Sequence, residues 1–165
     1  LRAQERTQDA ERMYRRALEI KEEAYDVQDP RVAATINNLA LVLIDAKQAA
    51  EAERLLRRRS LAIYEGVYGP NHRYVARTRA ILGQALLHLN RPDDAVAQLR
   101  RAVAIEEGAY GRASAILAGM YDHLGTAISE SGDAKEGRRY VARAQEIRRL
   151  LEARRKEAAR VNEEG

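Results

Sequence analysis

The sequence predicts an all-α solenoid, in which about seven helices stack as antiparallel pairs in a single domain over residues 1–165. The main observation is an internal repeat: the segment 29–69 recurs as 72–111, and again from Ser114, with a period of about 42 residues. The apolar residues are mostly Ala and Leu, with no Phe and no Trp, which favours helices packed at close range. Short turns between the predicted helices force neighbouring helices to run antiparallel.

The first predicted helix, at residues 7–26, lacks a partner helix. Ala10, Met13, Ala17 and Ile20 follow one another at spacings of three and four, so the segment is an amphipathic helix. It matches the second helix of the later repeats, and we therefore expect a truncated repeat. The predicted divisions are this unpaired helix at 7–26, repeats at 29–69, 72–111 and 114–150, and a polar C-terminal helix extension at 151–165.

Capping and turn residues mark the predicted helix boundaries. Asp29 can accept hydrogen bonds from free amides at a helix start, and Pro30 suits the first helical position. Asn90 and Gly132 tolerate the left-handed conformation that ends a helix. His72 is assigned to the turn between two repeats.

Small residues recur where the two helices of a pair must approach closely. They stand at the same place in each repeat: Ala40, Gly83 and Gly125 on the first helices, and Ala52, Ala95 and Gly137 on the second. Such contacts fix the pairing more firmly than general hydrophobicity does.

One helix carries an extra residue. The run Leu56–Ser60 reads LRRRS where the next repeat has LRRA, so one Arg is inserted. Because a helix usually absorbs a one-residue insertion as a π-bulge or as a local overtwist, we predict an irregular turn near 57–60.

The repeats resemble the tetratricopeptide repeat, in the subclass of about 42 residues that occurs in kinesin light chains and many bacterial multidomain proteins. The matching residues are Leu39-Ala40, Leu82-Gly83 and Leu124-Gly125 on the first helices, and Ala52, Leu56, Ser60, Ala95, Leu99, Ala102, Gly137, Val141 and Ala144 on the second. The His-Pro pair that usually precedes a repeat is incomplete, with Arg73 after His72 and Asp29 before Pro30. The resemblance covers residues 8 to about 150 and implies a right-handed superhelix that binds a peptide or protein in a concave groove lined by the first helices.

The candidate peptide-binding residues are those that helical spacing places on the groove side. They are Asn37, Asn38, Leu41, Arg77, Gln84, His88 and Asp122. The resemblance matches Asn37 and Asn38 to paired asparagines that hold an extended peptide, because an amide both donates and accepts. The alternative for this pair is a hydrogen bond between helices, or simple solvation. Arg77 and His88 are candidates for reading an acidic or C-terminal carboxylate.

Several other functions find no support in the sequence. There is no cysteine, the three histidines stand on different elements, and no catalytic triad or phosphate-binding loop is present. We therefore predict neither an enzyme nor a metal or cofactor site. The tyrosines, among them Tyr25, Tyr68 and Tyr110 at equivalent positions, are interpreted as packing residues.

The net charge of +4 lies on the last helix, because residues 134–165 carry ten basic and six acidic residues while the rest is balanced. Nucleic-acid binding is therefore a minor hypothesis restricted to that helix. A structural spacer that self-associates through Met13, Ala17 and Ile20 is the main alternative to peptide binding.

The wider setting is predicted from composition and from the first residue. Arg outnumbers Lys 25 to 4, and the chain starts at Leu1 inside a repeat, so we expect an excerpt of a larger bacterial protein. With no membrane-spanning run and no visible secretory signal, we expect a cytoplasmic protein without membrane contact.

Overall fold

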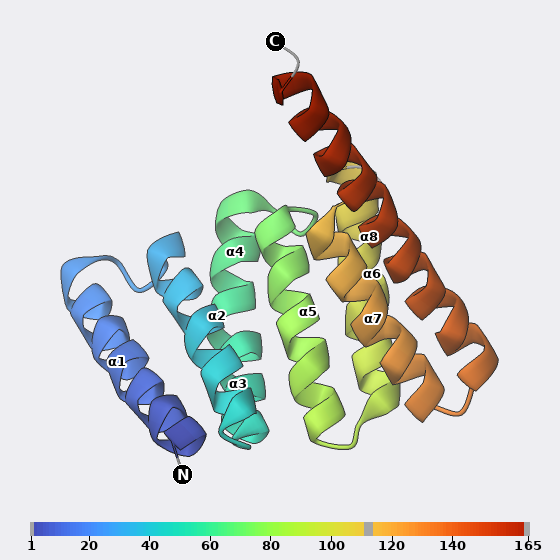
Figure 1. The fold of residues 1–165 in the computed structure, drawn as a ribbon. Coiled ribbons are helices and arrows are strands. Elements are labelled where there is room, and N and C mark those ends of the chain that lie inside the picture. Colours follow the sequence, from blue (N-terminus) through green and yellow to red (C-terminus); the bar gives the residue numbers. More distant parts are fainter. Residues whose placement is uncertain (1, 111–113, 164–165) are drawn as a thin grey trace.

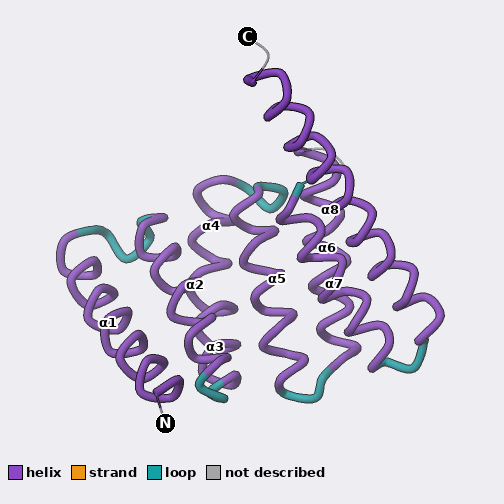
Figure 2. Tube along the Cα trace, in the orientation of Figure 1, coloured by secondary structure: helices purple, strands orange, loops and turns teal. Residues whose placement is uncertain are grey.

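The computed structural model describes residues 2–110 and 114–163, which form a row of helices joined by short turns (Figures 1 and 2). Because α3, the π-helical turn η1 and α4 follow one another without a break, the described residues form seven helices, with no strand among them. The elements are α1 (Arg2–Ala24), α2 (Pro30–Asp45), α3 (Ala49–Leu55), η1 (Leu56–Ser60), α4 (Leu61–Tyr68), α5 (Arg73–His88), α6 (Pro92–Tyr110), α7 (Ala115–Glu130) and α8 (Ala134–Glu163). This confirms the predicted all-α, right-handed solenoid of antiparallel helix pairs.

The helices α2, α5 and α7 each begin at a side chain that accepts a hydrogen bond from the free end of the helix. These bonds run from the N–H of Arg31 to Asp29 (2.8 Å), from that of Tyr74 to Nδ1 of His72 (3.3 Å), and from that of Leu117 to Ser114 (3.0 Å). The predicted cap at Asp29 and the predicted place of His72 in a turn are therefore confirmed.

Four turns among the described residues use a backbone conformation with a positive φ, and one of them is at Gly69, with a φ of 83°. Asn90 has a φ of 56° and Gly132 a φ of 112°, as predicted. Lys47 also has a positive φ, of 62°, which its residue type did not indicate. The N–H of Gln48 donates to the carbonyl of Leu43 at 2.7 Å, so the turn compensates for this strain with a hydrogen bond.

The core runs along the inside of the solenoid and is built from Ala and Leu. Leu39, Leu82 and Leu124 are buried on the first helices, and Leu56 and Leu99 are buried on the second. The last helix continues beyond this core: α8 extends past the other helices (Figure 1), and its residues 152–160 are exposed. None of the helices described over 2–110 and 114–163 has the length and apolar character that crossing a membrane requires.

The π-helix at Leu56–Ser60 confirms the predicted irregular turn. Leu56 and Ser60 are both buried, and they stand four residues apart where the equivalent Leu99 and Ala102 stand three apart. The wide turn therefore takes up one residue and returns both halves of the helix to the same buried face. The inserted Arg58 is exposed.

Deleting Arg58 is expected to leave the free energy of unfolding within about 0.5 kcal/mol of the wild type. The shortened helix has the regular spacing of α6. The deletion also keeps all the residues of two ion pairs, Arg57 with Glu53 and Arg59 with Glu22. Urea denaturation measures the effect.

The matched control is deletion of Arg101 in α6, which already has regular spacing. That deletion rotates Ala102 and the rest of α6 away from the core, so the variant is expected to unfold. A loss of more than about 2 kcal/mol on deleting Arg58 would contradict our account of the π-turn, because such losses need a named structural cause.

Candidate functional site

A pocket of about 350 Å³ opens where the first halves of α2 and α5 face the last turns of α4. From the predicted groove residues it brings together Asn37 and Asn38 of α2 and Arg77 of α5. We call this the α2–α4–α5 pocket. Its other polar and aromatic lining residues are Arg31, Tyr64, Tyr68 and Tyr74.

One wall of the pocket is a cluster of aromatic rings. The rings of Tyr64 and Tyr74 stack at 5.2 Å between centroids, and His72 stacks on Tyr68 at 4.5 Å. Burial raises the pKa of Tyr64 to about 12, so its hydroxyl stays neutral at physiological pH and can donate a hydrogen bond. Stacked rings with polar edges give a rigid surface for an incoming side chain.

The interpretation of the tyrosines as packing residues is wrong for part of the set. Tyr68 is 42% exposed and Tyr74 is 41% exposed, while Tyr64 is buried beneath them. Tyr25 is also exposed, with the guanidinium of Arg31 over its ring. The side chain of Tyr110 lies outside the described residues.

The two arginines of the pocket differ in their partners. Arg31 is bound to Asp29, with 2.6 Å between Nη2 and Oδ2, and its charge is largely balanced there. Arg77 is exposed, and within the described residues it forms no ion pair or hydrogen bond. The pocket therefore offers one uncompensated positive charge beside its aromatic wall.

The pairing of Arg31 with Asp29 has a measurable pH signature. The hydrogen bonds from Arg31 lower the pKa of Asp29 to about 2. A depressed carboxyl pKa stabilises the folded state above the unfolded pKa of about 3.9, and this contribution is lost as the pH falls through about 2. An NMR titration of the Asp29 carboxyl is expected to give a pKa near 2. In Arg31→Ala it is expected to rise toward the ordinary value, and an unchanged pKa would show that Arg31 is not the cause.

The two asparagines have different environments. Asn37 is 3% exposed, and its amide is hydrogen-bonded to Ser60 at 2.6 Å and to Thr78 at 2.8 Å. Asn38 is half-buried, and its side chain has no hydrogen bond within the part of the chain that the structure describes. Asn38 is therefore free to contact a ligand, whereas Asn37 is mostly held by the protein.

The remaining predicted site residues do not line this pocket. Leu41 and Gln84 are half-buried further along α2 and α5. His88 lines a second cavity, of about 800 Å³, beside the α2–α3 turn. The carboxylate of Asp122 is paired with Arg148 of α8, so it holds two helices together.

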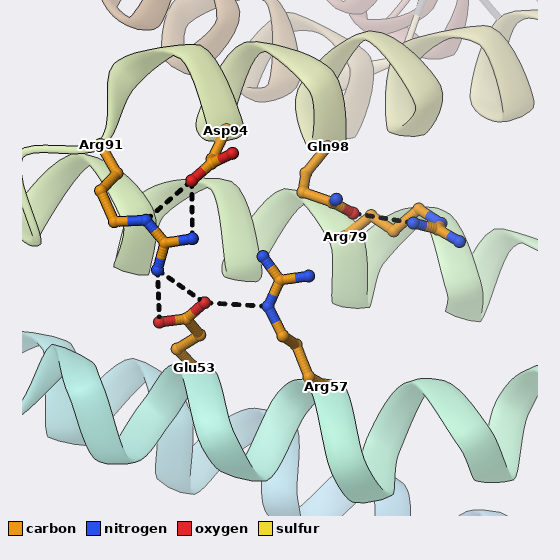
Figure 3. Close-up of polar contacts among 6 residues, drawn as sticks. All are labelled: Glu53, Arg57, Arg79, Arg91, Asp94 and Gln98. Atoms are coloured by element: carbon orange, nitrogen blue, oxygen red, sulfur yellow. Dashed lines mark hydrogen bonds and ion pairs between the residues drawn. The ribbon is translucent and has the colours of Figure 1, made fainter.

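Several exposed arginines of η1, of α6 and of the turn before α6 are paired with acidic side chains of this chain. Glu53 accepts hydrogen bonds from Arg57 at 2.9 Å and from Arg91 at 3.0 Å, and Arg91 also pairs with Asp94 (Figure 3). Arg100 contacts Glu136 in the same way, at 3.0 Å. The Glu53–Arg91 and Arg100–Glu136 pairs join successive helix pairs. All of these pairs reduce the positive charge available to a nucleic acid.

The described residues contain no cluster of three or more His, Cys, Asp or Glu side chains that could hold a metal ion. Burial lowers the pKa of His123, which favours its neutral form, but His123 belongs to no cluster of three or more such groups in the described part of the chain. The arrangement suits recognition by hydrogen bonds, stacking and charge.

Sequence reasoning missed the three tyrosines and Arg31. A signal was present, because Tyr64, Tyr68, His72 and Tyr74 fall within eleven residues of a chain that is only 5% aromatic. Tyr64 and Tyr68 also stand four residues apart, on one face of a helix. Their local density indicated more than packing.

A family model described as tetratricopeptide repeat matches residues 1–59 and 56–107. None of the curated proteins matches the sequence. Among solved structures, BtubC (BKLC) from P. vanneervenii is similar, with a TM-score of 0.77 and 26% sequence identity. The match covers 89% of this chain and 58% of that one, so this chain spans less than two thirds of that protein.

A putative kinesin light chain from Podospora anserina, with nearly identical repeats, has the same fold. A single-substitution variant of it matches with a TM-score of 0.70 at 19% identity, over 89% of this chain and 69% of that one. A second structure of that protein matches with a TM-score of 0.68 at 19% identity, over 91% of this chain and 71% of that one.

Proposed function

Because the chain belongs to the tetratricopeptide repeat family, we propose that it binds a segment of another protein in its concave groove, at the α2–α4–α5 pocket. Repeats of this family generally mediate protein–protein interaction. The groove and the kind of segment are our proposal.

The observation that carries the proposal is the uncompensated Arg77 beside the stacked tyrosines. An arginine without an acidic partner is ready to bind a carboxylate, and a carboxylate held by two parallel N–H groups is bound specifically. Aromatic anchors and arginines are also the side chains that most often dominate the energy of protein interfaces. We therefore expect an acidic residue, or a C-terminal carboxylate, next to an apolar side chain in the bound segment.

Asn38 supplies the remaining recognition group. Its free amide can pair with the backbone of an extended segment whatever side chains that segment carries. Arg77 would thus set the position of the segment, and the amide of Asn38 would hold the main chain of the segment.

A peptide array tests this function. The wild-type protein is applied to an array of peptides, half of them enriched in Asp and Glu, and the strongest binder is resynthesised; we call it the array peptide. We expect the double variant Tyr68→Ala/Tyr74→Ala to lose the acidic hits while keeping its helical circular dichroism. The control is Arg101→Ala, an exposed arginine on α6 away from the pocket. An array without hits, or with hits that survive the tyrosine variant, would overturn the proposal.

A second function, self-association as a structural spacer, is favoured by one observation. Met13 is 72% exposed and Ile20 is 50% exposed on the same side of α1. Light scattering over a wide range of concentration tests it, with Met13→Glu/Ile20→Glu as the variant. A concentration-dependent mass that this variant abolishes would favour the spacer, whereas a constant monomer mass would rule it out.

A further inference from the structure

A buried polar network lies beneath the α2–α4–α5 pocket and joins α2, η1 and α5. The hydroxyl of Ser60 donates to Oδ1 of Asn37 at 2.6 Å, and Nδ2 of Asn37 donates to the hydroxyl oxygen of Thr78 at 2.8 Å. The hydroxyl of Thr78 donates to the carbonyl of Tyr74 at 2.9 Å. All three network residues are buried. We call this the Asn37 network.

These bonds hold the Asn37 amide in a single orientation. The one hydroxyl hydrogen of Thr78 has its nearer acceptor in the carbonyl of Tyr74, at 2.9 Å against 3.3 Å to Oδ1 of Asn37. Thr78 therefore accepts from the nitrogen of Asn37. Ser60 then donates to the oxygen. The second N–H of Asn37 has no acceptor among the residues that the structure describes, and Asn37 lines the pocket.

The neighbouring helix junction shows that packing alone does not need such a network. The equivalent positions between α5, α6 and α7 are Ala80, Ala102 and Met120, which are all apolar and buried. The same fold thus closes with an apolar set one repeat further on. Buried polar groups are costly unless they are satisfied, so their presence at the junction that carries the pocket requires a reason beyond packing.

We propose that Ser60 and Thr78 are positioning residues for ligand binding: they hold the Asn37 amide so that its remaining N–H donates to a backbone carbonyl oxygen of the bound segment. This inference rests on the proposed function and adds to it the two buried residues that orient Asn37. The π-turn preserves this arrangement, because it returns Ser60 to the buried face despite the inserted arginine. Ser60 and Thr78 are positioning residues, and Asn37 makes the contact.

The test combines single variants with a double-mutant cycle, using the array peptide as the probe. Ser60→Ala and Thr78→Val are each expected to lower its affinity about tenfold, the effect of losing one well-placed hydrogen bond. In an Asn37→Ala background, adding Ser60→Ala is expected to cause no further loss, because the group that Ser60 positions is already gone. A merely structural Ser60 would lower affinity equally in both backgrounds.

Two further measurements locate the contact. In the first, each backbone amide of the array peptide is replaced in turn by an ester. At one position the ester is expected to lower the affinity for the wild type and to leave the affinity for Asn37→Ala unchanged. The apolar set Asn37→Ala/Ser60→Ala/Thr78→Val, which copies the next junction, is expected to fold with a melting temperature at least equal to the wild type, because the whole network is removed together. This set keeps the test valid if a single variant unfolds, and it is expected to bind no better than Asn37→Ala.

The outcomes separate the two proposals. If the array peptide depends on Tyr68 and Tyr74 but binds Ser60→Ala and Thr78→Val as tightly as the wild type, the inference is wrong and the proposed function stands. If no peptide binds in a manner that depends on the pocket, both are wrong.

Discussion

Gly137→Ala is expected to lower the free energy of unfolding by about 3 kcal/mol, because overpacking a tight helix contact typically costs this much. A Cβ at Gly137 would lie 2.5 Å from the carbonyl oxygen of Gly125 and 3.0 Å from the backbone nitrogen of Ser129. Both are backbone atoms of α7 and cannot turn aside. The methyl group would therefore separate α8 from α7, as predicted from the small residues at this contact. Urea denaturation followed by circular dichroism measures the loss.

The control is a glycine of α7 with free space around it. A Cβ at Gly119 meets no atom within 4 Å, so Gly119→Ala is expected to be neutral or to stabilise by up to about 1 kcal/mol, since Ala favours the helix over Gly. Equal losses in the two variants would contradict the close contact between α7 and α8.

Arg77→Glu is expected to lower the affinity for the array peptide by at least about 100-fold. A hydrogen bond between charged groups contributes roughly 1.5–3 kcal/mol, and reversing the charge adds repulsion from the acidic group. Arg77 is exposed and has no hydrogen bond or ion pair within the described residues, so the melting temperature should change little. Isothermal titration calorimetry measures the affinity.

The same charge reversal at Arg101, an exposed residue of α6, is the matched control and is expected to leave affinity within about threefold. Raising the ionic strength is expected to weaken wild-type binding and to affect Arg77→Glu much less, because salt screens exposed charges. Wild-type affinity in Arg77→Glu would exclude this arginine from the site.

The fold could be predicted because each of its determinants is local or repeated. The cap at Asp29 and the turn at Gly132 depend on residues close in sequence, and the small residue at Gly125 recurs at the same place in each repeat. The irregular turn was predicted from one extra Arg between Leu56 and Ser60 relative to the next repeat, and the structure shows that it is a π-helix. The positive φ of Lys47 was not predicted, because the left-handed conformation of that turn is set by its neighbours.

The candidate site could be predicted only in part, because it depends on contacts between distant residues. Helical spacing placed Asn37 on the groove side, yet its environment is set by Ser60 and Thr78, which lie 23 and 41 residues further along the chain. In the same way Asp122 was predicted from its face of α7, while its partner Arg148 comes from α8. Spacing along one helix indicates which face of the helix a side chain lies on. The neighbouring helices determine which side chains on that face remain free to bind a ligand.

The most direct test of the α2–α4–α5 pocket is an NMR titration of the isotope-labelled protein with the array peptide. We expect the largest shifts in the backbone amides of Asn38, Tyr68, Tyr74 and Arg77 and in the side-chain amides of Asn37 and Asn38. Shifts confined to Met13 and Ile20 of α1, or to the exposed residues 152–160 of α8, would place binding elsewhere and contradict the account.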